Sequence, residues 1–140
     1  MEYVCDAPDG KTWFRIVTEA EAMTESQEMR HAVEKYFRRE WNKAAESFKP
    51  ASMVFVEQAI GLQAHILREM PLFLTLRDSE GTVLATAMLP AGGKPDQSFG
   101  SIVVGPANAD PYPAHGEAIK ALAYHFGIPL DRSRCYPYRR

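Results

Sequence analysis

LFLTLRDSEGTVLATAML, residues 72–89, is the stretch of this sequence that decides its fold class. Its two apolar runs, 72–77 and 82–89, flank a four-residue turn. Asp78 suits the opening of that turn, and Gly81 accepts the left-handed backbone that closes it. Every second residue of the first run is leucine, which places one face of that strand in the core. The stretch therefore predicts an antiparallel β-hairpin.

A second hairpin is predicted near the start of the chain. Residues 3–5 and 13–17 are rich in aromatic and β-branched side chains, and residues 7–10, APDG, lie between them. Proline presets the first central turn position, aspartate suits the second, and glycine accepts positive φ after it. Residues 101–104, SIVV, predict one further short strand.

The clearest helical pattern begins at Thr18 or Thr24 and ends near Phe48. Each threonine is followed three residues later by Glu or Gln, the arrangement of a capping box. Acidic side chains, Glu25 among them, fill the N-terminal end, as the helix dipole favours. The apolar residues that recur at three- and four-residue steps as one buried stripe are Met29, Val33, Phe37, Trp41, Ala44 and Phe48.

Two further helices are predicted. Residues 52–70 carry a weaker helical pattern, although residues 53–56 could instead form a short strand. The stripe of that pattern consists of Val56, Ala59, Ile60, Gln63, Ile66 and Leu67. The last helix covers residues 113–126, and Gly127 followed by Ile128 is typical of a glycine-terminated helix end.

These elements predict an α+β fold in one compact domain, residues 1–140. Two antiparallel hairpins and a further strand form a sheet that is covered by about three helices, because hairpins and helices do not alternate as in a doubly wound sheet. Residues 131–140 form a polar, aromatic and basic tail.

The composition is that of an ordinary globular chain. It has 140 residues, 46% of them hydrophobic and 24% charged, with a net charge of −2. We expect no nucleic-acid partner, because such proteins carry a strongly basic face. No apolar run is long enough to span a membrane, and no export signal is visible. We therefore expect a soluble, cytoplasmic protein in which Cys5 and Cys135 stay reduced.

No sequence motif identifies a metal or cofactor. The four histidines lie far apart in sequence, and neither cysteine has a neighbouring ligand, so no metal site is predicted. Phosphate-binding, dinucleotide and nucleophile-elbow motifs do not occur. We predict no cofactor.

A few residues are candidates for chemistry or binding. His115 lies near the start of the last helix, where the dipole favours a neutral imidazole that could act as a base, although it could equally cap a neighbouring carbonyl. Arg38 and Arg39 could line an anion pocket, or simply form a solvated helix face. Arg132 and Arg134 alternate with tyrosines, a pattern that can hold phosphates, or they belong to a self-docking tail.

The sequence favours a non-catalytic binding or regulatory domain that forms a homodimer, with an unknown small-molecule ligand. No catalytic motif is present, while residues 53–67 hold more apolar side chains than one buried stripe requires. Leu62 and Phe55 fall off that stripe, and two-fold pairing is the commonest way to cover such residues.

An enzyme is the alternative, because the order of elements resembles the acyl-coenzyme A-dependent N-acyltransferase superfamily. The corresponding segments are the central hairpin 72–89, the strand 101–104 before the cofactor loop, and the cofactor helix 113–126. The family's Gln/Arg-x-x-Gly-x-Gly/Ala cofactor loop is missing. Pro106, Pro111 and Pro113, which lack N–H groups, and Asp110, which would repel a pyrophosphate, stand in its place.

Overall fold

The computed structural model describes residues 1–49 and 55–139 of the chain and confirms the α+β class. Its centre is a five-stranded antiparallel sheet in the order β1-β2-β3-β4-β5, so each strand pairs with its neighbours along the chain. The strands are β1 (Glu2–Ala7), β2 (Lys11–Arg15), β3 (Leu72–Arg77), β4 (Val83–Leu89) and β5 (Ile102–Val104).

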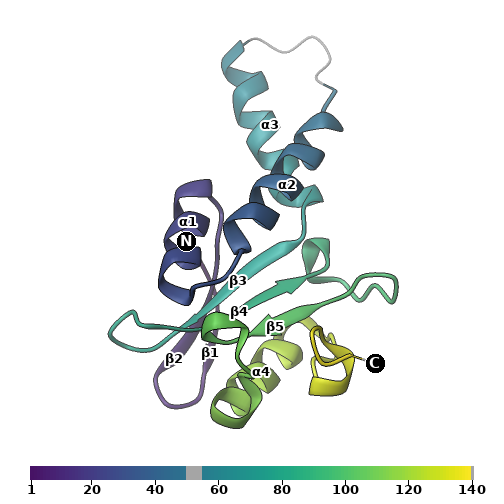
Figure 1. Ribbon diagram of the computed structural model, residues 1–140. Coiled ribbons are helices and arrows are strands. Elements are labelled where there is room, and N and C mark those ends of the chain that lie inside the picture. Colours follow the sequence, from purple (N-terminus) through teal and green to yellow (C-terminus); the bar gives the residue numbers. More distant parts are fainter. Residues whose placement is uncertain (50–54, 140) are drawn as a thin grey trace.

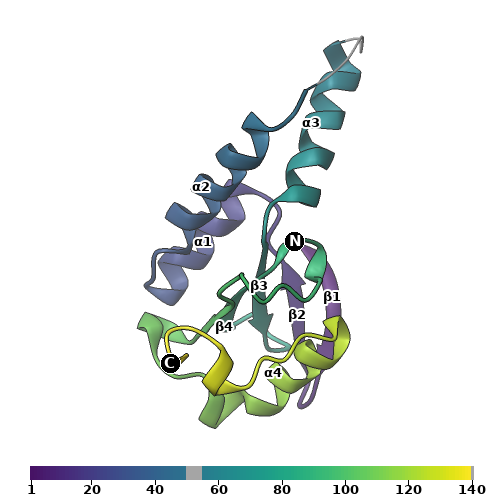
Figure 2. The same cartoon turned by 90° about the vertical axis from the view of Figure 1, so that its right-hand side faces the viewer.

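Helices lie on both faces of this sheet. Three of them, α1 (Glu19–Met29), α2 (Val33–Glu46) and α3 (Phe55–Glu69), come between β2 and β3 and lie on one face. The fourth, α4 (Tyr112–Phe126), follows β5 and covers the other face (Figure 1). The view turned by 90° shows the three layers, with α2 and α3 extending beyond the sheet as a pair (Figure 2).

The central strand β3 contributes to a core on each face. Leu72, Leu74 and Leu76 pack toward α4, in a cluster with Trp13 and Leu122. Phe73, on the opposite face, packs against the three helices, in a cluster that includes Phe37 and Ile66. Alternation along one strand therefore fills both cores. The prediction that the leucine face of this strand is buried is confirmed, and the structure places that face under α4.

Both predicted hairpins are present. The 78–81 turn closes as expected, since Asp78 Oδ1 accepts the N–H groups of Glu80 and Thr82 and Gly81 has φ 84°. The first hairpin differs in one detail, because Asp9 as well as Gly10 has a left-handed backbone. Aspartate tolerates that conformation better than most residues, since its short polar side chain can hydrogen-bond locally.

The prediction of the first helix is wrong in one respect, because the segment forms two helices. α1 begins at the Thr18 capping box, with Glu21 as the partner, and ends where Arg30 takes φ 55°. α2 then starts at Val33 in a new direction. The break is invisible to the periodicity, since Met29, Val33 and Phe37 keep four-residue steps across it and all three are buried.

The stripe predicted for residues 52–70 is correct only in part. Ile66 and Leu67 of that stripe pack into the core, but so does Leu62, which was expected to lie off it, and Ile60 is 67% exposed. The N-terminal half of α3 extends away from the sheet (Figure 1), so Ile60 has no core to enter. The alternative strand at 53–56 lies partly outside the described residues, and residues 55 and 56 are helical.

The last helix ends as predicted. Gly127 has φ 68°, its N–H bonds to Ala123 O, and Ile128 is buried behind it. With α1 to α4, the described part of the chain has four α-helices rather than about three. None of the helices in residues 1–49 and 55–139 is long and apolar enough to cross a bilayer.

Candidate functional site

A hollow of about 330 Å³ lies on the sheet face that carries α1 and α2. Its floor is formed by Thr86 and Met88 of β4 and by Ile102 and Val104 of β5. This volume falls in the range of small-molecule sites. The hollow lies beside the start of α2 and over the edge strand β5, and on this face no α-helix of the described chain lies over β5 (Figure 1).

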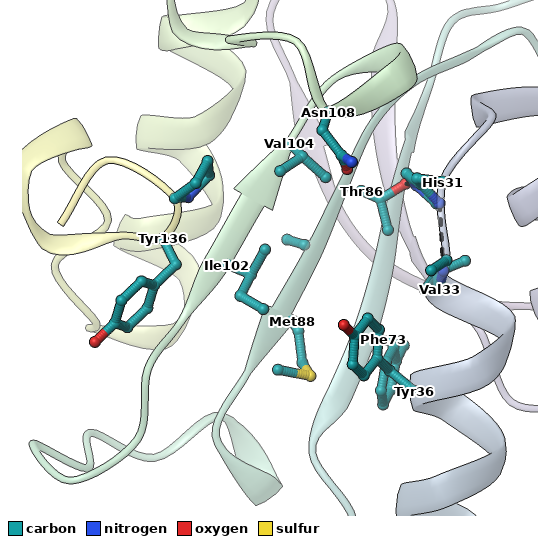
Figure 3. Close-up of a pocket in the computed structure, with 13 residues that line it drawn as sticks. His31, Val33, Tyr36, Phe73, Thr86, Met88, Ile102, Val104, Asn108 and Tyr136 are labelled. Carbon is teal, nitrogen blue, oxygen red and sulfur yellow. Dashed lines mark hydrogen bonds between the residues drawn. The ribbon is translucent and has the colours of Figure 1, made fainter.

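Two different walls face each other across this floor. One wall is the turn between α1 and α2 together with the first turn of α2, which place His31, Val33 and Tyr36 at the rim. The other comprises Asn108 and the tail residues Tyr136 and Pro137 (Figure 3). The hollow is therefore built from segments far apart in sequence.

A buried polar chain ends at this hollow. Arg77 Nη2 donates to Glu25 Oε1 at 3.2 Å, and the Thr86 hydroxyl donates to Glu25 Oε2 at 2.5 Å. His31 Nε2 lies 2.9 Å from the same hydroxyl. Glu25 has 0% of its surface exposed, so its carboxylate depends on protein neighbours rather than on water for hydrogen bonds.

The chain of hydrogen bonds fixes the tautomer of His31. The Thr86 hydroxyl has one proton and gives it to Glu25, so it accepts from His31 Nε2–H. His31 Nδ1 is then an acceptor, and the Val33 N–H points to it at 3.4 Å. Burial lowers the pKa of His31, which favours this neutral form, and burial raises the pKa of Glu25 against the pull of Thr86 and Arg77.

The tail wall is tied to the edge of the sheet. Tyr136 N donates to Ser101 O at 2.8 Å and Val103 N donates to Tyr136 O at 3.2 Å, which makes a parallel bridge beside β5. Cys135, the residue before this bridge, has 0% exposure in the α4 core. A buried anchor and two backbone bonds therefore position Tyr136 at the hollow.

His115 lies on the other side of the sheet, away from the hollow. Its Nδ1 lies 3.1 Å from Lys11 Nζ in a small polar recess between the β1–β2 turn and the start of α4. Burial and the Lys11 charge both lower the pKa of His115, so the imidazole is neutral, as its helix position predicts. No candidate arginine lines this recess.

The four candidate arginines do not converge. Arg38 pairs with Glu19 and Glu34 on the helix surface, and Arg39 pairs with Glu40. Arg132 Nε donates to Asp110 at 2.8 Å while its guanidinium stacks on a tyrosine ring.

Arg134 Nε lies 3.2 Å from Asp131 on the same short turn. It also borders a recess that Arg139 lines, beside the loop between β4 and β5. Arg132 and Arg134, the two candidate arginines of the tail, are thus paired with acidic neighbours.

Both cysteines are free thiols in the α4 core region. Cys5 is half-buried on β1 and Cys135 is buried in the tail. Burial raises the pKa of the Cys135 thiol, although arginines flank it in sequence. This thiol is therefore not activated.

Among residues 1–49 and 55–139, no three His, Cys, Asp and Glu side chains come together as metal ligands. Comparison with protein-family models, with curated proteins and with solved structures gives no match for this chain. The site must therefore be interpreted from its own chemistry.

The sequence offered little sign of this site. In the sequence, Glu25 is one of several acidic residues near the start of a helix. Its partners Arg77 and Thr86 lie 52 and 61 residues away. A helical-wheel projection of α1 would have helped, since it places Glu25 on the same face as Ala22 and Met29, which are both buried.

Proposed function

We propose that this protein is a non-catalytic binding domain whose small-molecule ligand occupies the hollow over β4 and β5. The observation that carries the proposal is the apolar floor of Met88, Ile102 and Val104 left open beside a helix-covered sheet. Ligand sites are typically concave and apolar with a few fixed polar groups. His31 and Thr86 supply such groups here, and their hydrogen bonds lock both side chains.

A neutral fluorescent dye tests this proposal. Nile red should bind with saturable 1:1 fluorescence, and Ile102→Trp should weaken binding at least ~10-fold, because the indole fills part of the hollow. Ile60→Trp is the matched control, since it makes the same change on the exposed face of α3. The proposal fails if wild-type protein does not bind the dye, or if both variants bind it equally.

The proposal includes a homodimer that acts in the cytoplasm. Of the apolar α3 residues from 57 onward, Leu62, Ile66 and Leu67 pack within the chain, which leaves Ile60 as support for self-association. The unactivated Cys135 thiol is compatible with a reducing compartment. Light scattering tests the homodimer, and the effect of reductant on the melting temperature tests the assignment to a reducing compartment.

An acyl-coenzyme A-dependent transferase is a second candidate that one observation favours. After β5 the chain crosses over through α4 and returns parallel to β5 at Tyr136. That order continues the resemblance to the N-acyltransferases. Two positions of their loop motif also occur at Gly116 and Ala118, with Pro113 where the family has Gln or Arg.

The start of α4 does not fit the pyrophosphate of such a cofactor. Tyr112 N–H already donates to Asp110 Oδ1 at 3.0 Å, Pro113 has no N–H, and His115 N–H donates to Pro111 O at 2.8 Å. The Tyr112 N–H and Arg132 lower the pKa of Asp110, which keeps a negative charge there. The binding-domain proposal therefore takes precedence.

Thermal melting with acetyl-coenzyme A separates the two candidates. A ligand that binds only the folded state raises the melting temperature, and the stabilisation grows with the logarithm of one plus the ratio of its concentration to its Kd. The binding-domain proposal predicts no rise at millimolar acetyl-coenzyme A. A clear rise that Asp110→Asn enhances would favour the transferase, because that change removes the charge facing the pyrophosphate.

A further inference from the structure

The hollow has a polar end and an apolar end. His31 and Thr86 lie close to one another at one end, with Asn108 facing them, while Met88 and Phe73 lie toward the other (Figure 3). Tyr36 and Tyr136, which are 40% and 46% exposed, border the opening. A ligand that fits this arrangement has an apolar body and one polar head.

Asn108 is held in an unusual conformation. It has φ 62°, and Ala107 before it has φ 53°, in the short turn Pro106–Asn108 that follows β5. Left-handed backbone is costly for alanine, and such strain clusters at binding sites. Asn108 is exposed, and its carboxamide makes no hydrogen bond to the described residues, so a ligand that displaces water can use both its donor and its acceptor.

The charge around the hollow disfavours an ionised head. Of the described residues that line it, none is an Asp, Glu, Lys or Arg side chain. The nearest charge identified along the polar chain is the Glu25 carboxylate, one hydrogen bond behind Thr86. The guanidinium groups of Arg39 and Arg139 lie over the rings of Tyr36 and Tyr136 at the opening. At the polar end, a ligand carboxylate would therefore lose hydration without a charged lining residue to compensate it, which is unfavourable.

We propose that the hollow binds an uncharged amphiphile whose amide head is recognised by the Asn108 carboxamide and whose alkyl or aryl body lies over Met88 and Phe73. This inference rests on the proposed function and specifies the ligand class of the same site. An amide pairs with a carboxamide through one donated and one accepted hydrogen bond. Each such bond contributes about 0.5–1.5 kcal/mol net, so the pair is worth roughly tenfold in affinity.

Octanamide and octanoate are the probes, because they share chain length and shape and differ in charge. At pH 8 we expect octanamide to bind at least ~10-fold more tightly than octanoate, by calorimetry. Asn108→Gly should weaken octanamide binding roughly tenfold, because it removes both hydrogen bonds to the amide head. Glycine also relieves the left-handed backbone at this position, so the variant should melt no lower than wild type.

Gln97→Gly is the matched control, since it removes a carboxamide from an exposed loop outside the hollow. It should leave the affinities for octanamide and octanoate unchanged. Nile red binding without a preference for octanamide overturns this inference and leaves the proposed function standing. An unchanged octanamide affinity in Asn108→Gly does the same. Failure of wild-type protein to bind both octanamide and Nile red overturns both proposals.

Discussion

Glu25→Ala should destabilise the protein more than any surface substitution on α1. Glu25 has 0% exposure and accepts hydrogen bonds from Arg77 at 3.2 Å and Thr86 at 2.5 Å. The alanine variant leaves the Arg77 guanidinium, whose side chain is 14% exposed, without its carboxylate. Breaking a buried pair from one side costs about 3–5 kcal/mol.

Removal of both charges should cost much less. Burial raises the pKa of Glu25, which means that the surrounding bonds do not fully offset the loss of hydration. A double variant, Glu25→Leu with Arg77→Met, leaves no unpaired charge and replaces the pair by apolar groups. Such replacements are often neutral, so the double variant should be more stable than Glu25→Ala by at least ~2 kcal/mol.

Urea denaturation followed by circular dichroism measures these differences as shifts of the midpoint at constant slope. Glu28→Ala on the exposed face of the same helix is the control and should change the free energy of unfolding by under about 0.5 kcal/mol. A loss below about 1 kcal/mol for Glu25→Ala would refute the reasoning, since it would mean that water replaces the missing carboxylate. A double variant as unstable as Glu25→Ala would show that shape rather than charge dominates.

Further measurements test the fold and the state of the chain. Phe37→Ala should cost about 3–5 kcal/mol in urea, because the ring is 1% exposed between α2 and Phe73, and a loss below about 1 kcal/mol would place it outside the core. The melting temperature should not respond to reductant, whereas a large drop would indicate that Cys5 and Cys135 form a stabilising disulfide. Light scattering at micromolar concentration should give a dimer, and a constant mass of 15.7 kDa would exclude one. Burial lowers the pKa of His31, so the folded state resists its protonation and stability should fall as pH drops below about 6.5; His31→Gln should flatten that slope, and an unchanged slope would contradict it.

The sequence was most informative where the determinants are local. The hairpin at 72–89 depends on Asp78 and Gly81, whose effect on the turn needs no knowledge of the rest of the chain. The end of α1 at Arg30 carries no glycine or proline, so nothing local marks it. Tertiary packing of the helices against the sheet favours that bend, and a single sequence does not display such packing.

The candidate site was harder to predict for the same reason. The side chain that pairs with His31 belongs to Thr86, on a strand 55 residues later. Asn108 follows β5 in a proline-containing segment. The prolines indicate that a cofactor loop is missing, and no pattern there distinguishes the asparagine. The residues at the rim of the hollow belong to segments far apart in the sequence. Only the order of the strands in the sheet brings them together.

The position of β3 determines when the domain can fold during synthesis. Its leucines complete the core under α4 and Phe73 completes the core under the other helices, yet β3 follows the first two strands and three helices along the chain. The nascent N-terminal half therefore has no finished core to bury its apolar faces against. Once β3 has been made, α1 to α3 can pack on one face, whereas the other face waits for α4, which follows β5. Because β3 belongs to both cores, the two faces should unfold as one cooperative unit.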